Sequence, residues 1–297
     1  KDQSDGLRKG FALPGDVLLS HKATIGRTAI VPASEFPYLM LTPQVTYYRV
    51  LDKGVLDNKF LKYYFDSPWF QKALGLWAGA GSTRAYLGIT EQKNLPITIP
   101  DIKIQKGIVD VLSVVDEKIK LNNQINCELE AMAKLIYDYW FVQFDFPDEN
   151  GKPYKSSGGK MVYSEELQKE IPLGWCTGSL LDIATFTNGV ACQKFPTIKG
   201  EDFYKVIKIK EMGSGFSEKS DLVSKGIPDD RVVNRGDVLF SWSATLLVKI
   251  WHGEVGGLNQ HIFKVTSETY PRSFYFHALL RYLDHFKMMA EMRKTTM

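Results

Sequence analysis

Residues 104–139 read IQKGIVDVLSVVDEKIKLNNQINCELEAMAKLIYDY, and this stretch decides the fold. Its apolar side chains recur with the seven-residue period, abcdefg, of a coiled coil. The a positions are Ile108, Val115, Asn122, Leu129 and Ile136, and the d positions are Ile104, Val111, Lys118, Ile125, Met132 and Tyr139. No Pro or Gly falls between Ile108 and Tyr139, so nothing interrupts the helical hydrogen bonds. The pattern predicts one uninterrupted helix.

The same period indicates that this helix pairs with another one. A repeat of this length is typical of a coiled-coil strand, here about 50 Å long at ~1.5 Å per residue. Asn122 favours a single register, because its amide needs a polar partner across the seam. A long surface helix on a globular core is the alternative. We expect a pairing face made of Ile108, Val111, Val115, Asn122, Ile125, Leu129, Met132 and Ile136.

The composition is that of a globular protein with room for two domains in 297 residues. No apolar run approaches the ~20 residues needed to cross a bilayer, and the first residues do not resemble a signal peptide. Cys127, Cys176 and Cys192 are far apart and odd in number, which favours reduced thiols over disulfides or a metal site. We therefore expect a cytoplasmic protein with no membrane contact and no cofactor.

The charges divide the chain into two basic modules with an acidic middle. Residues 1–100 carry 12 Lys and Arg against 8 Asp and Glu, and residues 171–297 carry 16 against 13. Acidic residues outnumber basic ones in the helix region, 101–145, and in the polar linker, 146–170. We assign an α/β module to each basic segment. The excess of positive charge suits contact of both modules with a polyanion.

Local patterns predict the elements of the first module. Strands are expected at 17–20, 28–31, 45–50 and 95–99, and an aromatic helix at 58–76 that Pro68 can split. The linker after the long helix is polar but contains Phe144, Phe146 and Tyr154, which indicates docking rather than free coil.

An internal repeat relates the two modules. The sequence GDVLLS at 15–20 recurs as GDVLFS at 236–241, and Ala23-Thr24 recurs as Ala244-Thr245. Pro43-Gln44 aligns with Asn259-Gln260, each followed by a strand, and the aromatic helix from Phe60 aligns with one from Phe274. The two copies begin and end at different points of the repeat. We therefore expect both modules to be incomplete, as in a window cut from a longer tandem repeat.

No catalytic constellation is visible, and the candidate residues point to DNA instead. Ser20 and His21 lack the carboxylate of a catalytic triad, and the GAGSTR segment at 79–84 lacks the ending of a phosphate-binding loop. Hydroxyl groups reach phosphate oxygens, and arginine can bind guanine with two hydrogen bonds. We expect DNA contacts from strand ends, small-residue loops and a basic run: Ser20, His21, Lys22, Arg27, Ser82, Thr83, Arg84, Lys205, Lys208, Lys210, Ser241 and Trp242. A solvated strand face is the alternative for Lys205, Lys208 and Lys210.

Several of these segments, in this order, resemble the specificity (S) subunit of type I restriction–modification enzymes. They are PGDVLLS at 14–20 with IGR at 25–27, GST at 81–83, LPITIP at 95–100, residues 108–119 of the helix, GKPYKSSGG at 151–159 and IPLGW at 171–175. The chain departs from the family at Ala23, where glycine is usual, and at Arg84, where glutamine is common.

The resemblance implies an α+β fold of two repeated α/β target-recognition domains joined by a long coiled-coil-type helix. It also implies that each domain reads half of a split site in double-stranded DNA. Modification (methyltransferase) subunits would dock on the helices, the restriction subunit would join through the complex, and this chain would not be an enzyme. A homodimer through the spacer helix is a further expectation. A helical scaffold whose domains bind protein partners is the alternative.

Overall fold

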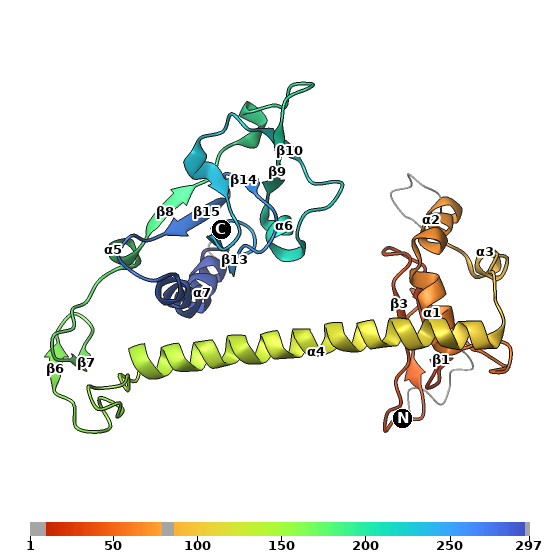
Figure 1. The fold of residues 1–297 in the computed structure, drawn as a ribbon, viewed down its shortest axis with the longest axis horizontal. Helices are drawn as coiled ribbons and strands as arrows, with labels where there is room; N and C mark the ends of the chain where they lie inside the picture. Colours follow the sequence, from red (N-terminus) through yellow and green to blue (C-terminus); the bar gives the residue numbers. More distant parts are fainter. Residues whose placement is uncertain (1–9, 79–85, 295–297) are drawn as a thin grey trace. The chain divides into compact units, whose positions relative to one another are not determined.

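A computed structural model of the chain describes residues 10–78 and 86–294. The chain forms two compact units, Lys1–Cys127 and Glu128–Met297, which we call the first and second unit. Both contain strands and helices, and the helix α4, Ile102–Phe141, begins in the first and ends in the second (Figure 1). The predicted α+β fold with one long helix between two sheet-containing parts is confirmed.

The helix α4 is longer than predicted by two residues at each end. Pro100 precedes it, and the Asp101 carboxylate accepts the backbone N–H of Lys103 (2.8 Å), which satisfies a free donor of the first turn. The side chain of Gln105 is fully buried and fixes this end of the helix. Its amide donates to the carbonyls of Val55 and Pro100 (2.8 Å each) and accepts the backbone N–H of Asp57 (2.9 Å).

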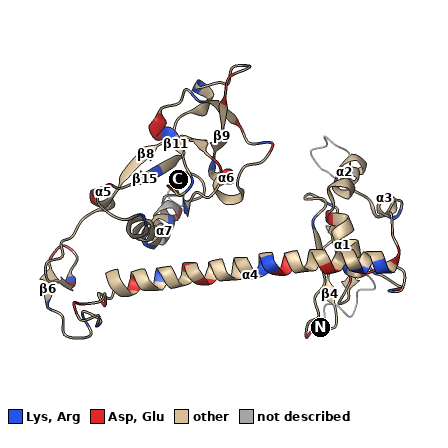
Figure 2. Ribbon diagram, viewed as in Figure 1, with Lys and Arg blue, Asp and Glu red and all other residues tan. Residues whose placement is uncertain are grey.

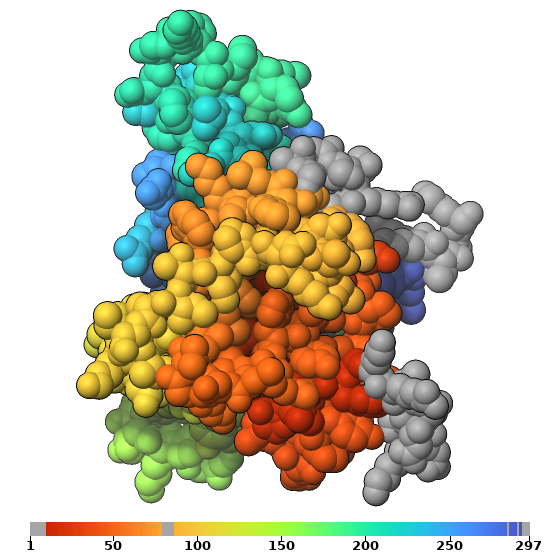
Figure 3. Space-filling model, turned by 90° about the vertical axis from the view of Figure 1, so that its right-hand side faces the viewer, coloured from red at the N-terminus to blue at the C-terminus, as the bar shows by residue number. Residues whose placement is uncertain are grey.

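The first unit is built on a three-stranded antiparallel sheet in the order β3-β2-β5. Its strands are β2 (Val17–Ser20), β3 (Thr28–Ile30) and β5 (Val45–Tyr48), and β1 (Phe11–Ala12) pairs with β4 (Leu39–Met40). The helices are α1 (Asn58–Asp66), α2 (Pro68–Trp77) and α3 (Ile89–Lys93). Val17 and Leu19 of β2 pack against Leu61, Phe65 and Phe70 of the helices, so the alternating pattern of the strand buries one face. Figure 3 shows the orange and yellow residues of these helices and of the start of α4 as one continuous surface.

The aromatic helix of the first unit divides at Pro68, as predicted. Pro68 cannot donate to the preceding turn but fits the first position of a new helix. Ser67 completes the break, because its hydroxyl accepts the backbone N–H of Phe70 (3.2 Å).

The prediction of a strand at 95–99 was wrong. This segment pairs with no strand in the described part of the chain, and Pro96 and Pro100 have no N–H to donate to a sheet. The backbone N–H of Thr98 donates instead to the Tyr64 hydroxyl (3.1 Å).

The second unit contains two four-stranded sheets, in the orders β13-β12-β15-β8 and β10-β9-β14-β11. The first sheet is antiparallel, whereas β14 and β9 of the second sheet pair in parallel. The strands are β8 (Thr185–Asn188), β9 (Phe203–Ile207), β10 (Leu222–Ser224), β11 (Val232–Val233), β12 (Val238–Ser241), β13 (Leu247–Ile250), β14 (Gly256–Leu258) and β15 (Ile262–Thr266). Three helices accompany them: α5 (Leu180–Ile183), α6 (Ile209–Ser214) and α7 (Arg272–Lys294).

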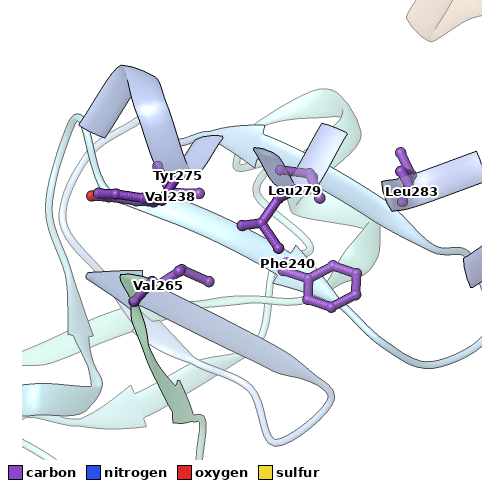
Figure 4. Close-up of a cluster of buried hydrophobic side chains, with 8 residues drawn as sticks. Val238, Phe240, Val265, Tyr275, Leu279 and Leu283 are labelled. Atoms are coloured by element: carbon purple, nitrogen blue, oxygen red, sulfur yellow. The ribbon is translucent and has the colours of Figure 1, made fainter. Parts of the chain in front are cut away.

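The core of the second unit lies between α7 and the antiparallel sheet. Tyr275 and Leu279 of α7 lie over Val238, Phe240 and Val265 of the strands (Figure 4). Burying side chains of this size contributes ~1.5–3 kcal/mol each to folding.

The internal repeat extends to the backbone. Gly15 and Gly236 have positive φ angles of 90° and 99°, and each turn carries its chain into the central strand, β2 or β12. The backbone N–H of Gly15 donates to Val31 (2.9 Å) and that of Gly236 to Trp251 (2.7 Å). Ala23 and Ala244, in the loops that follow, share the left-handed region, with φ of 65° and 55°.

The two copies also attach their helices in the same way. The Asn58 amide at the start of α1 donates to the Gly15 carbonyl, and the Arg272 guanidinium at the start of α7 donates to the Gly236 carbonyl (2.9 Å). This equivalence confirms the predicted match of the helices from Phe60 and Phe274.

One predicted match was shifted by a residue. Val45 lies opposite Ser20, and Ile262 lies opposite Ser241, so Pro43-Gln44 corresponds to Gln260-His261 rather than to Asn259-Gln260.

The linker after α4 is folded, as its aromatic residues predicted. Phe146 stacks on Tyr154 and on Trp175, with ring centroids 4.7 and 5.1 Å apart, and Phe144 meets Trp175 edge to face. The hairpin of β6 (Met161–Ser164) and β7 (Lys169–Pro172) follows. None of the helices in the described ranges is long and apolar enough to cross a membrane.

Asp16 is the buried acid of the first repeat. Burial alone raises the pKa of this carboxyl group, but its hydrogen bonds with Arg49 (2.7 and 2.9 Å) and with the Leu13 N–H (2.7 Å) outweigh burial and lower the pKa below its usual value. Asp237 holds the same place in the second copy and accepts the Asn234 N–H (2.8 Å). Among the described residues it forms no ion pair with arginine.

We predict that Asp16→Asn lowers the free energy of unfolding by ~1–3 kcal/mol, because it leaves the Arg49 guanidinium without its ionised acceptor. Asp237→Asn should cost less. Because the folded-state pKa of Asp16 is depressed, its contribution is present above the unfolded pKa and is lost as the pH falls through the folded value. Urea unfolding between pH 3 and pH 7 measures both effects, and equal losses in the two variants would contradict the prediction.

One histidine in each unit has its pKa lowered by burial: His21 is buried and His277 is half-buried. Burial lowers the pKa of His21, and the positive charge of Lys22 lowers it further. Burial also lowers the pKa of His277, and the negative charge of Asp138 partly offsets this decrease. The Nδ1 atom of His277 is buried without a hydrogen-bond partner among the described residues.

We predict that the protein loses stability as the pH falls from 7.5 to 5.5. Because the pKa of each histidine is lower in the folded state, the unfolded chain binds more protons as the pH falls through the unfolded pKa, so each contributes a slope of at most about 1.4 kcal/mol per pH unit. His21→Gln should reduce this slope, and the exposed His252→Gln serves as its control. Denaturant titrations at several pH values test this. A slope unaffected by His21→Gln would contradict it.

Candidate nucleic-acid interface

The end of β2 is a tight loop that turns basic side chains outward. The backbone N–H of Ser20 donates to the Arg27 carbonyl and that of Gly26 to the Ser20 carbonyl, both at 2.9 Å. The Ser20 hydroxyl accepts the Arg27 N–H (2.9 Å), so its role in the loop is structural. Lys22 and Arg27 are exposed, which suits contact with phosphates.

His21 is buried within this loop, with 5% of its surface exposed. Its Nδ1 lies 2.9 Å from the Thr46 hydroxyl, and its backbone N–H donates to the Gln44 carbonyl (2.9 Å). The ring of Tyr86 covers it edge to face, with centroids 5.9 Å apart. His21 thus supports the positions of Gln44 and Tyr86, both of which are exposed.

The end of β12 repeats this arrangement with other side chains. The Ser241 hydroxyl is fully buried and donates to the Thr245 carbonyl. Trp242 takes the place of His21 but is 44% exposed. Its indole N–H donates to the Asn188 side chain at the end of β8 (3.3 Å), and its ring lies 5.7 Å from that of His261.

The turn before the second neighbour of the central strand, β5 or β15, has the same form in both units. Val45 N–H donates to the Thr42 carbonyl (3.2 Å), and Ile262 N–H donates to the Asn259 carbonyl (3.0 Å). The two central residues of the turn are Pro43 and Gln44 in the first unit, and Gln260 and His261 in the second. The sequence did not single out Gln44, Gln260 or His261, although a correct alignment of the repeat would have placed them beside His21 and Trp242.

The basic run at 205–210 does not form one strand face, so that alternative was wrong. The strand β9 ends at Ile207, and Lys210 lies in α6. Lys208 pairs with Asp221, and the ammonium of Lys205 lies 5.7 Å from the centre of the Phe216 ring. The backbone changes direction at Lys208 because α6 begins there, and the three side chains share no element. Ser82, Thr83 and Arg84 lie outside the described residues.

The predicted pairing face of α4 is exposed in the chain. Its seven apolar members are 38–66% exposed, the extremes being Ile108 and Val111. The residues of α4 that contact the first unit lie on another side. They include Asp116, which accepts a hydrogen bond from the Tyr63 hydroxyl (2.9 Å). Burial, the larger cause, and this hydrogen bond together raise the pKa of Tyr63 to about 12. Figure 2 shows the charges of α4 as short bands with long uncharged stretches between them.

No site for catalysis or metal binding stands out in the described ranges. They contain no group of three His, Cys, Asp or Glu side chains that could hold a metal ion. An open pocket of about 330 Å³ in the first unit is lined mainly by apolar residues. The Tyr48 hydroxyl and Gln92 hydrogen-bond to each other at its wall (3.0 Å), and burial raises the pKa of Tyr48 to about 12, so neither group is prepared for proton transfer near neutral pH.

Comparison with known proteins gives one family. Residues 6–131 match the type I restriction modification DNA specificity domain. The MjaIX specificity subunit of a type I restriction enzyme from Methanocaldococcus jannaschii is 27% identical over 278 residues, which are 91% of this chain and 60% of that protein. The HindI specificity subunit of Haemophilus influenzae is 44% identical over 52 residues, 18% of this chain and 11% of that protein. The chain thus spans less than two thirds of either relative.

Solved structures of the same kind align with most of the chain. The alignment with the type I restriction-modification S subunit from M. genitalium covers 95% of this chain and 68% of that subunit, with 16% identity and a TM-score of 0.44. The alignment with the HsdS subunit from Thermoanaerobacter tengcongensis covers 94% of this chain and 68% of that subunit, with 14% identity and a TM-score of 0.34. The sequence matches support the family resemblance seen in the sequence: residues 6–131 match the type I restriction modification DNA specificity domain, and the chain is similar to type I specificity subunits.

Proposed function

We propose that this chain is a non-catalytic specificity subunit that binds double-stranded DNA and reads a bipartite site, one half with each unit. The match of residues 6–131 to the DNA specificity domain carries the proposal. Methylation and cleavage would then belong to modification and restriction subunits bound to this chain.

The repeated loops support DNA contact by both units. Lys22 and Arg27 are exposed on the loop of the first unit, and exposed cations of this kind neutralise phosphates and release counterions. A repeated backbone frame suits two half-sites, because each copy presents the same strand ends to its own stretch of DNA. The proposed site residues Ser20, His21 and Ser241 support this frame rather than touch DNA, and Trp242 remains a candidate for direct contact.

The exposed face of α4 supports binding of other helices. In an antiparallel pair, a positions of one helix lie opposite d positions of the other. If two copies pair about residue 120, Asn122 of each lies opposite Lys118 of the other, and its amide oxygen can accept from that ammonium group. Within residues 104–136, every other layer of the seam is then apolar. A pair centred on residue 122 would instead place the two Asn122 side chains against each other. We favour the pair centred on residue 120.

The apolar surface of α4 is wider than a two-helix seam. Leu112, Val114, Ile119, Leu121 and Leu135 flank the a and d positions and are 38–65% exposed. Flanking positions in a two-helix coiled coil are usually charged. We propose that modification subunits bind these flanks, beside the second copy of α4.

The DNA proposal predicts separate effects on affinity and on its salt dependence. Lys22→Ala and Arg27→Ala should each weaken binding to all duplexes alike and reduce the slope of log K against log salt by about one. Lys59→Ala is the control, because Lys59 is exposed but lies away from the loop. It stands at the start of α1 beside Asn58, whose amide binds the turn at the opposite end of β2. Titrations from 50 to 300 mM salt measure the slopes.

An unchanged slope in both loop variants would show that another face meets the DNA. If the wild-type chain shows no salt-dependent binding to any duplex, the DNA proposal fails and a scaffold that binds protein partners is favoured.

The pairing of α4 predicts an effect of Asn122→Leu on assembly. The change places a leucine opposite the Lys118 ammonium of the second copy, so we expect a loss of register and a mixture of oligomeric states rather than unfolding. Asn123→Leu makes the same substitution one residue away, off the seam, and should leave the assembly unchanged. Light scattering at micromolar concentration, with circular dichroism to verify folding, is the measurement. A strictly monomeric wild-type chain would contradict the pairing.

A further inference from the structure

The strand ends of the two units combine one backbone frame with different side chains. Position one follows the central strand and holds His21 or Trp242. The other two positions are the centre of the adjacent turn, Pro43 and Gln44 or Gln260 and His261. The backbone joins them in both copies: His21 N–H donates to the Gln44 carbonyl (2.9 Å), and Trp242 N–H donates to the His261 carbonyl (3.4 Å).

The second unit holds this cluster in place from beneath. Asn259 is buried, and its side-chain oxygen accepts the backbone N–H of His261 (3.3 Å) at the start of the turn. Gly189 allows β8 to approach the turn, because a Cβ there would overlap the Asn259 carbonyl. Its own N–H donates to the Ile262 carbonyl (3.0 Å), which brings the neighbouring Asn188 to the indole of Trp242.

The exposed groups of this cluster match the chemistry of base edges. Gln260 and His261 lie together, with their Nε2 atoms 3.3 Å apart, and His261 is exposed whereas Gln260 is half-buried. A glutamine amide pairs with the N7 acceptor and N6 donor of adenine in the major groove, and an apolar surface suits the thymine methyl. Trp242 supplies such a surface, and its ring is already oriented by Asn188, so little entropy is lost on binding.

We propose, resting on the proposed function, that Gln260, His261 and Trp242 read bases in one half-site and that Gln44, beside Tyr86, reads a base in the other. The glutamine of each unit contacts the adenine of an A·T pair. In the first unit the exposed ring beside the turn is that of Tyr86, which His21 supports from below. The common frame sets where the side chains stand, and their identity sets which base pair is preferred.

The test is selection of duplexes from a randomised pool by the full chain and its variants, at two salt concentrations. Gln260→Ala should reduce discrimination at one or two adjacent base pairs by roughly 5- to 150-fold, the equivalent of 1–3 kcal/mol at 1.4 kcal/mol per tenfold. Gln44→Ala should do so at a different position, in the other half of the site. Neither should change the salt slope. Gln143→Ala, an exposed glutamine on the linker, is the matched control.

A substitution that changes the preferred base separates reading from general weakening. Gln260→Glu places a carboxylate where the amide stood, and carboxylates accept from the N4 amino group of cytosine. The preferred base at that position should therefore shift from adenine to cytosine. Circular dichroism and the thermal midpoint establish that each variant is folded.

Three results would overturn the inference. The first is a wild-type preference that survives unchanged in the folded Gln260 and Gln44 variants. The second is an equal loss of affinity for all sequences with a smaller salt slope, which would identify phosphate contacts. The third, a wild-type chain that selects no sequence at either salt concentration, would overturn the proposed function as well.

Discussion

The carbonyl groups of Gly15 and Gly236 connect sheet and helix in the two copies of the repeat. Each glycine turns the chain in the left-handed region, and the turn directs its carbonyl toward the first residue of the helix that covers the sheet. Asn58 and Arg272 donate to these carbonyls, so one hydrogen bond fixes the start of α1 on β2 and of α7 on β12. A side chain at either glycine would be strained by the φ angle, and at Gly15 a Cβ would also lie 2.9 Å from the Asn58 amide nitrogen.

This connection explains how different side chains produce the same frame. Asn58 and Arg272 share only the ability to donate, and Asp16 has an arginine partner whereas Asp237 has none among the described residues. Backbone hydrogen bonds repeat at Gly15, Val31 and their counterparts, and each aspartate side chain also accepts the N–H three residues before it. Covering residues such as Tyr86 and Trp242 could therefore differ without a change in strand geometry.

Periodic and repeated features of the sequence predicted most of the fold. The heptads of α4, the division at Pro68 and the repeated GDVL segments depend on local chemistry, and the structure contains all three. The segment at 95–99 was misread because its apolar residues resemble a strand, whereas Pro96 within it and Pro100 after it have no N–H to donate to a sheet. The alignment of Pro43 was off by a residue, since only the strand register, Val45 opposite Ser20, defines it. The burial of His21 and the pairing of Lys208 with Asp221 depend on distant segments, which one sequence cannot place.

The serines at the strand ends have a consequence for how the protein can vary. Ser20 and Ser241 use their hydroxyl groups to close the loops from within, so the loop backbone does not depend on the exposed side chains beside it. Exchange of a residue such as Gln44 or His261 changes the surface chemistry with little effect on folding free energy, as surface substitutions usually do. A lineage can thus try new surfaces by single neutral steps, while the serines and glycines of the loop backbone keep each of them presented at the same point.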